Sequence, residues 1–288
     1  MTARRRDEAT GVDTTGHEWD GIEELDNPMP RWWLWVFLAT ILWSVGYWIL
    51  MPSWPLVSGY TKGLLGYSTR EKVVDDLRRA RDAQGAMLER IRAVSVDEIR
   101  TDPELLAFAI GAGRSAFAVN CSPCHGSGAA GAKGYPNLND DDWLWGGTAP
   151  EIERTIKYGI RSGHPEAHVN DMPSFVQTGL LTPRQASDAA EYVLSLSNRS
   201  TDRAAATRGR EVFAANCTAC HGDDARGNQE LGAPNLADAI FLYGGDKATL
   251  VATISNGRRG VMPAWDGRLD VDVIKELAVY VHALGGGK

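Results

Sequence analysis

A single long uncharged run interrupts the mixed polar and apolar pattern near the start of the chain. From Trp32 to Met51 the sequence contains 20 residues without a charge. As a helix that rises about 1.5 Å per residue, this run would be about 30 Å long, which is the thickness of a bilayer's hydrocarbon core. Trp and Tyr cluster at both ends of the run, as is typical of helices that cross membranes. We therefore predict a transmembrane anchor over residues 31–55, ended by Pro52 and Pro55.

A cleaved signal peptide is the alternative for this run. The run is longer than the apolar region of a typical signal peptide, and no Ala-x-Ala-like cleavage site follows Met51. Length and the missing cleavage pattern both favour a retained anchor.

The segments that flank this run carry different patterns. Residues 1–30 are polar and acidic without helical or strand periodicity, so we predict a disordered tail there. Residues 56–104 begin with a loop rich in glycine and aromatic residues, which we expect to lie on the membrane surface or on a partner. From Arg70 to Ala93 apolar residues recur at three- and four-residue spacing, which predicts a connecting helix with one packed face.

The remainder of the chain is an internal repeat. Seven positions around the first cysteine pair match residues 96 positions later: Gly113, Phe117, Asn120, Cys121, Cys124, His125 and Gly126. A unit of this length is too long for a solenoid repeat and has the size of a small domain. Each copy predicts a helix, a Gly-rich loop, a short helix, a Met-Pro loop and a closing helix, without a convincing strand pair. We therefore predict an all-α protein in which residues 105–198 and residues 205–288 form two tandem domains, each closing on itself.

Each copy contains the pentapeptide Cys-x-x-Cys-His, the attachment sequence of a c-type haem. All four cysteines of the chain lie in these two pentapeptides: Cys121, Cys124, Cys217 and Cys220. Their thiols would add to the two vinyl groups of each haem. The histidine that follows, His125 or His221, would lie beneath the ring and ligate the iron. The sequence therefore predicts two covalently bound haems c.

Other cysteine chemistry explains less of this pattern. Zinc sites usually place their cysteine pairs about 15–20 residues apart, whereas Cys124 and Cys217 are 93 positions apart. A thioredoxin-like pair would explain one Cys-x-x-Cys but neither the duplication nor the histidines. Four cysteines in 288 residues are also too few for a disulfide framework.

Two methionines at equivalent positions of the repeat are the candidates for the sixth iron ligand. Met172 and Met262 each precede a proline, and Met/His is the usual pairing in cytochromes c. We expect each methionine to serve the haem of its own copy. The first copy carries eight extra residues that include His164 and His168, and either imidazole is an alternative ligand for the first haem. For both methionines the alternative is a core position under an adaptable loop.

Other side chains of the repeat are candidates for contact with the haem. Arg161 and Arg259 occupy matching positions before the Met-Pro loops, where they would pair with a haem propionate or remain solvated. We expect Trp143, Trp145 and Tyr243 to pack on the haem edges.

The net charge and the need for export indicate where the chain works. A formal charge of −7 argues against nucleic-acid binding. Covalent haem attachment takes place outside the cytoplasm in bacteria, so the haem domains must be exported. Lys and Arg are nearly balanced around the uncharged run and do not orient it. The haem motifs orient it instead: we expect a cytoplasmic N-terminus and periplasmic haem domains on a bacterial inner membrane.

These features together resemble the di-haem subunit, subunit III, of the cbb3-type cytochrome c oxidases, which are the C-family haem–copper oxidases. The similar features are the single span with its exit over residues 51–55, the loop over residues 63–70, and two His/Met class I cytochrome c domains. The resemblance covers nearly the whole chain from about residue 28. The haem motifs are common to cytochromes c in general. The membrane exit and the loop that follows it are the features that point to this particular subunit.

The resemblance implies an electron-transfer subunit of a respiratory terminal oxidase. Such a subunit accepts electrons from a quinol-oxidising cytochrome bc complex or a small cytochrome c. It passes them through a mono-haem cytochrome c subunit to the haem–copper catalytic subunit, where oxygen is reduced. Once His125 and His221 ligate iron, no histidine cluster remains for a copper or oxygen site, so we expect no catalytic residue on this chain.

Two other classes of function remain open from the sequence. One is a membrane-anchored di-haem carrier that works alone or as the cytochrome subunit of a periplasmic dehydrogenase. The other is a haem enzyme or gas sensor, which requires an open or displaceable sixth position. The two Met-Pro loops argue against this second class.

Overall fold

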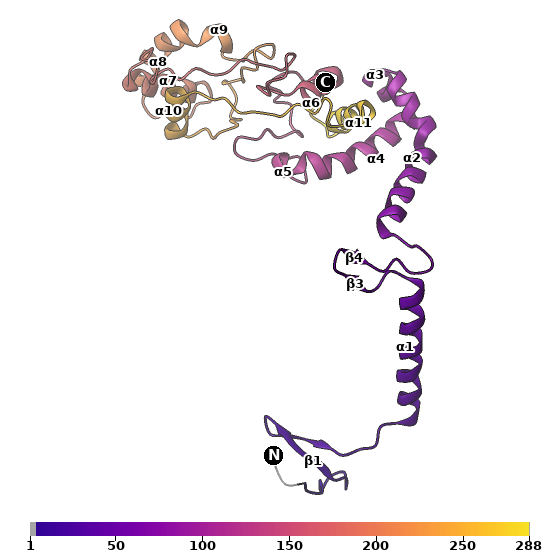
Figure 1. Ribbon diagram of the computed structural model, residues 1–288. Coiled ribbons are helices and arrows are strands. Elements are labelled where there is room, and N and C mark those ends of the chain that lie inside the picture. The colour runs from indigo at the N-terminus through magenta and orange to yellow at the C-terminus, as the bar shows by residue number, and fades with distance from the viewer. Residues whose placement is uncertain (1–3, 288) are drawn as a thin grey trace. The chain divides into compact units, whose positions relative to one another are not determined.

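The computed structural model describes residues 4–287 and is mainly helical (Figure 1). The chain divides into two compact units, and the boundary in the sequence lies between Asp82 and Ala83. The all-α class predicted from the repeat is confirmed, and among the described residues the strands all lie in two short hairpins of the first unit.

Helix α1, Arg31–Leu50, coincides with the uncharged run in the first unit. It buries none of its side chains, and Leu42 and Trp43 are 74 % and 77 % exposed. A helix that is apolar on every face belongs in an apolar environment. Among the described residues, α1 alone is long and apolar enough to cross a membrane. The helix ends two residues before Pro52, as the break in the pattern predicted.

The N-terminal segment is a hairpin, which differs from the disordered tail predicted for residues 1–30. Strand β1, Thr14–Trp19, pairs with the antiparallel strand β2, Ile22–Leu25. The connecting residues Asp20 and Gly21 have φ values of 51° and 85°, as a type I′ turn requires. The Asp-Gly dipeptide is itself a hairpin signal, but the flanking residues lack the apolar alternation that would have revealed it.

A second hairpin follows α1 and leads into a long helix. Strands β3, Pro55–Leu56, and β4, Gly59–Tyr60, are antiparallel. Helix α2, Thr69–Ala93, matches the connecting helix predicted from residue 70.

The second unit contains the remaining helices. They are α3 (Val96–Thr101), α4 (Pro103–Asn120), α5 (Ser122–His125), α6 (Ala149–Tyr158), α7 (Pro183–Leu196), α8 (Arg203–Asn216), α9 (Thr218–His221), α10 (Lys247–Asn256) and α11 (Val271–His282). Local sequence sets several of their N-termini. Thr148 and Thr182 form capping boxes with Glu151 and Gln185, which satisfy backbone N–H groups at the starts of α6 and α7.

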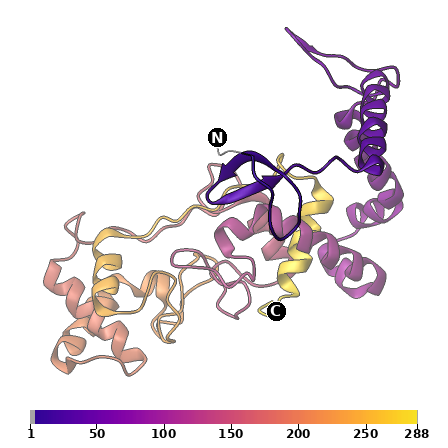
Figure 2. The ribbon, with the colours of Figure 1, turned by 90° about the horizontal axis from the view of Figure 1, so that it is seen from below.

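In the second unit, the last helix of each repeat copy packs on helices of the other copy. Helix α11 of the second copy packs on α4 and α6 of the first copy, while α7 of the first copy packs on α8 and α10 of the second. The two core clusters follow the same division. Extended segments carry the chain between the two groups of helices in both views (Figures 1 and 2). The expectation that residues 105–198 and 205–288 each close on themselves therefore differs from the observed packing.

Equivalent contacts in the two copies explain how this exchange is possible. Gly113 on α4 lies against the backbone of Glu276 and the side chain of Tyr280, where a Cβ would collide. Gly209 on α8 meets the backbone of Asp188 and the side chain of Tyr192 in the same way. Because both interfaces use the same repeat positions, a helix can exchange partners and keep the same contact.

The short connection between α7 and α8 favours this exchange. Helix α7 ends at Leu196 and α8 begins at Arg203, and helices joined by so short a loop usually pack as antiparallel neighbours. The buried carboxylate of Glu191 fixes the loop: it accepts hydrogen bonds from the Ser200 hydroxyl at 2.6 Å and the Thr201 N–H at 3.2 Å.

Candidate haem-binding sites

Both pentapeptides fold as a single helical turn directly after a long helix. Helix α4 ends at Asn120, Cys121 caps it, and α5 carries the chain on to His125. Helix α8 ends at Asn216, Cys217 caps it, and α9 carries the chain on to His221. The two cysteines of each motif are three residues apart on one turn, so their side chains lie on one face, where both reach the same macrocycle.

The imidazoles are oriented by the carbonyl of a proline in the loop that follows. His125 Nδ1 lies 3.1 Å from the carbonyl oxygen of Pro136, and His221 Nδ1 lies 3.0 Å from that of Pro234. A carbonyl only accepts, so Nδ1 carries the proton and Nε2 keeps the lone pair that binds iron. Burial lowers the pKa of both histidines, partly opposed by these bonds, and so favours the neutral ligand form. The sequence shows the repeated Pro-Asn-Leu but not this orienting role.

The thiols suit covalent attachment rather than a redox role. All four cysteines are unpaired, as thioether formation requires. Burial raises the pKa of Cys121 to about 11, with a further increase from Cys124. Burial has the same effect on Cys217, whose pKa is also about 11. Reactive redox cysteines have lowered values instead, so the structure argues against the thioredoxin-like alternative.

The loops beneath the two motifs have the same path. Gly131 N–H donates to the His125 carbonyl at 2.8 Å, and Gly227 N–H donates to the His221 carbonyl at 2.8 Å. A Cβ at either glycine would collide with backbone of the same loop. Ala129 adopts a positive φ of 57° and Ala225 one of 59°. Two sites with one geometry and one donor set would hold two copies of the same group.

Each candidate methionine packs with residues of the other repeat copy rather than only with those of its own. Met262 belongs to the core cluster that contains Cys121, and its backbone N–H and C=O both pair with Ile160 at 3.0 Å. Met172 belongs to the other cluster, and its backbone pairs with Arg258 through two bonds of 3.1 Å. Each methionine loop thus lies against the end of the short helix from the other copy, α6 or α10.

The aromatic residues beyond the methionines follow the same exchange. Trp265 N–H donates to the carbonyl of Ile156 on α6 at 3.3 Å, and Phe175 N–H donates to the carbonyl of Ile254 on α10 at 3.2 Å. The sequence predicts both methionines as iron ligands, but it does not predict this exchange, because equivalent positions in a repeat are indistinguishable by pattern.

The two extra histidines of the first copy have other partners. Arg154 can only donate, so His168 Nδ1 accepts from it at 3.3 Å, and His168 Nε2 therefore donates to the Thr155 hydroxyl at 3.1 Å. The His168 ring also stacks on Trp145 at 4.2 Å. His164 Nδ1 accepts from the Glu166 N–H at 3.0 Å. These contacts occupy both ring nitrogens of His168 and one of His164.

The arginines before the methionine loops bond to protein groups. Arg161 donates to the carbonyl of Gly260 at 2.6 Å and to the carbonyl of Asn170. Arg259 forms an ion pair with Asp171. These bonds tie together the two chain segments that cross between the copies.

The aromatic residues expected on the haem edges also have protein contacts. Trp143 donates from Nε1 to the carbonyl of Gly286, and the guanidinium of Arg258 lies 4.3 Å from the Tyr243 ring.

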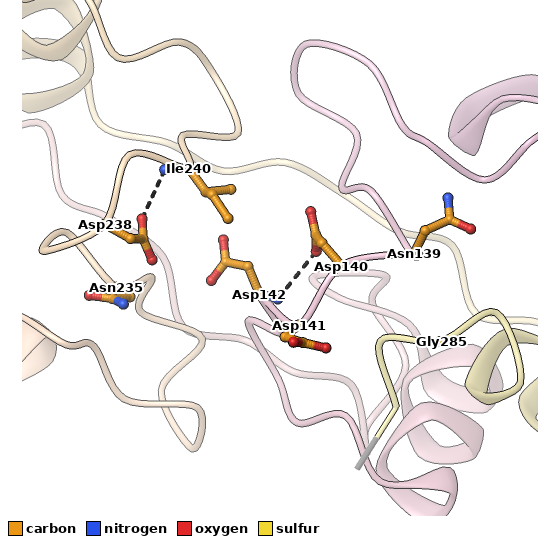
Figure 3. A pocket seen from close by; sticks show the side chains of 8 residues that line it. All are labelled: Asn139, Asp140, Asp141, Asp142, Asn235, Asp238, Ile240 and Gly285. Carbon is orange, nitrogen blue, oxygen red and sulfur yellow. Dashed lines mark hydrogen bonds between the residues drawn. The ribbon is translucent and has the colours of Figure 1, made fainter.

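A cavity of about 590 Å³ lies where the loops that follow the two motifs meet (Figure 3). Its lining is mostly acidic and amide side chains: Asn139, Asp140, Asp141, Asp142, Asn235, Asp238, Ile240 and Gly285. The carboxyl of Asp142 lies between those of Asp140 and Asp238 (Figure 3). Burial and these two neighbours raise its pKa to about 6. The lining contains none of the predicted cysteine, histidine and methionine ligands. Within residues 4–287, no group of three or more His, Cys, Asp or Glu side chains is arranged to hold a metal ion.

Two families of known proteins match this chain. The family described as cytochrome c oxidase, cbb3-type, subunit III matches residues 108–193 and 204–281. The family described as the N-terminal domain of cytochrome oxidase-cbb3, FixP, matches residues 11–58.

Individual relatives match over almost their full length. The chain is 55 % identical over 283 residues to the cbb3-type cytochrome c oxidase subunit FixP of Azorhizobium caulinodans, which covers 98 % of this chain and 96 % of the relative. It is 53 % identical over 295 residues to the subunit CcoP of Azospirillum brasilense, with 100 % of both chains covered.

Proposed function

Because this chain belongs to the family of cbb3-type cytochrome c oxidase subunit III, we propose that it is the membrane-anchored di-haem electron-transfer subunit of such an oxidase. Membership makes it a cytochrome c with covalently bound haem c and a subunit of a cbb3-type oxidase complex. Our proposal adds one haem at each pentapeptide. Its main support is the equal geometry of the two motifs, from the helical turn to the proline carbonyl that orients each histidine.

We assign the sixth iron ligands crosswise. Met262 serves the haem held by Cys121, Cys124 and His125, and Met172 serves the haem held by the second pentapeptide. The shared core of Met262 and Cys121 and the backbone pairing of Met262 with Ile160 support the first assignment. The pairing of Met172 with Arg258 supports the second. The hydrogen bonds made by His168 and His164 favour a methionine over either imidazole.

The residues of each site keep its geometry constant. Haem c, when bound, supplies reversible one-electron chemistry. The two cysteines of each motif would attach the group as thioethers, and the histidine held by the proline carbonyl would bind its iron. The methionine of a Met-Pro loop, which is fixed by two backbone bonds, would supply the remaining ligand and so exclude oxygen or peroxide. A site that does not rearrange suits electron transfer rather than catalysis.

The anchor and the partners complete the proposal. Helix α1 holds the chain in the inner membrane, with the N-terminal hairpin in the cytoplasm and the second unit in the periplasm. The chain accepts electrons from a quinol-oxidising cytochrome bc complex or a small cytochrome c. It passes them toward a mono-haem cytochrome c subunit and the haem–copper subunit that reduces oxygen.

Single-haem variants test the ligand assignment. In a Cys121→Ala/Cys124→Ala background, the haem at the second pentapeptide alone remains. We expect Met172→Leu to abolish its near-infrared sulfur–iron charge-transfer band, and Met262→Leu to leave the band in place. The Cys217→Ala/Cys220→Ala background should give the opposite result. If each methionine instead serves the haem of its own copy, both outcomes reverse.

Purification from membranes tests the function. We expect the tagged chain, extracted in a mild detergent, to carry two haems by the pyridine haemochrome assay. A mono-haem cytochrome and a multi-span haem subunit should co-purify with it, and the complex should reduce oxygen. Recovery as a stable monomer, with no haem–copper partner, would contradict the proposal.

A further inference from the structure

The uncharged run continues well beyond the end of α1. The helix ends at Leu50, but the first charge after it is Lys62, so 30 consecutive residues from Trp32 to Thr61 lack a charge. The residues beyond the helix also expose large apolar side chains. Val57 at the tip of the β3–β4 hairpin is fully exposed, and Leu64 is 78 % exposed. Several exposed apolar side chains in one short segment indicate an interaction site.

This surface is fixed to the end of α1 by backbone hydrogen bonds. Leu64 N–H donates to the Ile49 carbonyl at 2.9 Å, and Leu65 N–H donates to the Leu50 carbonyl at 3.1 Å. The Ser53 hydroxyl donates to the carbonyl of Trp48 at 3.2 Å. The chain thus returns to satisfy carbonyls of the last helical turn, which otherwise have no partner. Carbonyls at the edge of the hydrocarbon region need such partners because water is scarce there.

A glycine permits this close return. Gly63 has a φ of 70°, and a Cβ there would collide with the backbone of Leu50 and Met51. The segment over residues 52–67, which we call the exit cap, is therefore built onto the helix end.

The hairpin inside the exit cap also satisfies its own backbone. Pro55 pairs with Tyr60 and Leu56 with Gly59. Thr61 N–H donates to the Trp54 carbonyl at 2.9 Å, and Trp54 N–H donates to the Thr61 hydroxyl at 3.0 Å. These bonds satisfy both backbone groups of Trp54 and the N–H of Thr61 at the base of the hairpin. What it presents outward at the tip are the side chains of Leu56 and Val57.

We propose that the exit cap is a lipid-binding element, with Leu56 and Val57 inserted among the acyl chains of the outer leaflet. The inference rests on the membrane anchor of the proposed function. Composition identifies lipid as the partner, because the cap combines an apolar tip with residue types that concentrate at membrane interfaces. Those residues are Trp54, Tyr60, Lys62 and Tyr67. Trp54 packs edge-on against Trp48 of α1 at 4.8 Å, so the tip and the helix reach fixed depths together. The cap thereby sets how far α1 can slide or tilt.

A depth measurement tests this proposal on the full haem-loaded chain. The native cysteines are consumed by haem attachment, so a new cysteine is the only labelling site. Val57→Cys, Leu42→Cys and Val169→Cys each receive an environment-sensitive fluorophore, and each chain is placed alone in phosphatidylcholine nanodiscs. Leu42 lies within α1 and reports on the anchor. Val169 is an exposed valine of the second unit, 74 % accessible, and serves as the matched control.

We expect blue-shifted emission at positions 57 and 42, with quenching by nitroxide-labelled lipids, and a water-like emission at position 169. Quenching at 42 with water-like emission at 57 would overturn the cap proposal and leave the anchor standing. Water-like emission at both 42 and 57 would instead remove the anchor. Emission at 57 that becomes blue-shifted only in the assembled oxidase would assign the surface to a protein partner and also overturn the proposal.

Discussion

The two crossed helix pairs of the second unit have the same packing but different charges. In both pairs a glycine of one helix touches the backbone of the other, and an aromatic pair lies alongside. The ring centroids of Phe117 and Tyr280 are 5.5 Å apart, and those of Tyr192 and Phe213 are 5.1 Å apart.

The acidic residue beside the glycine contact is where the pairs differ. Asp188 receives two hydrogen bonds from Arg208, at 2.9 Å and 2.7 Å. The position equivalent to Arg208 on α4 is Ala112, so Glu276, the counterpart of Asp188, lacks that cation. Among the described residues, Glu276 Oε1 has no hydrogen-bond partner although the residue is 3 % exposed.

The pKa values of the two acids follow from this difference. The hydrogen bonds from Arg208 hold the pKa of Asp188 below its usual range. Burial, reinforced by Asp272 on the same helix and opposed by Arg92, raises the pKa of Glu276 to about 7. The comparison shows that backbone packing is kept between the copies, while the charges at its edge have diverged.

The largest expected effect comes from filling the glycine contacts. Gly113→Ala and Gly209→Ala each place a methyl group where backbone of the partner helix already lies. We expect each to lower the free energy of unfolding by about 3 kcal/mol, as overpacking in an interface does. Urea unfolding of the haem-loaded second unit within the full chain measures this.

The matched control for the glycine variants is Gly111→Ala on α4, where a Cβ meets nothing within 4 Å. It should stabilise by about 0.5–1 kcal/mol through helix propensity. Equal losses at positions 113 and 209 would support equivalent packing. A loss of stability at one position alone would show that the two helix pairs are not packed equivalently.

A smaller effect is expected from removing the cation of the α7–α8 pair. Arg208→Ala leaves the buried Asp188 carboxylate without its donor, so the urea midpoint should fall at pH 7, by less than in the glycine variants. The folded pKa of Asp188 is depressed, so the pair stabilises above the unfolded pKa of about 4 and this contribution is lost as the pH falls further. The difference from wild type should therefore shrink below pH 4. Arg210→Ala, an exposed arginine of the same helix, is the control and should change neither value.

Neutralising Glu276 should increase the stability of the protein instead of lowering it. Its folded pKa is raised above the unfolded value of about 4.3, so the native carboxyl progressively costs stability as the pH rises from that value to about 7. Glu276→Gln removes this cost. We expect the variant to match wild type at pH 4 and to exceed it by about 1 kcal/mol at pH 8, measured by urea unfolding. A gain that is the same at both pH values would show that the carboxyl does not titrate in this range.

Local features of the chain could be predicted from sequence, and long-range pairing could not. The anchor, the haem pentapeptides and the connecting helix are encoded by composition, spacing and periodicity within short windows. The crossed packing is not encoded in this way, because Gly113 and Gly209 occupy the same repeat position and either fits either partner. The choice depends on the length and fixation of the loop between α7 and α8. The pKa of Glu276 also depends on a residue of another helix, so no local pattern reveals it.

The smallest expected effect comes from supplying the missing cation to the α4–α11 pair. Ala112→Arg places an arginine at the position that Arg208 holds on α8, within reach of Glu276 if the two pairs share their geometry. We expect the pKa of Glu276 to fall and the loss of stability between pH 4 and pH 8 to flatten, by less than the change in Glu276→Gln, because a half-exposed arginine is screened by solvent. Ala112→Met adds comparable bulk without charge and should leave the pH dependence as in wild type. An arginine variant that titrates like the methionine variant would show that the geometry has diverged together with the charge.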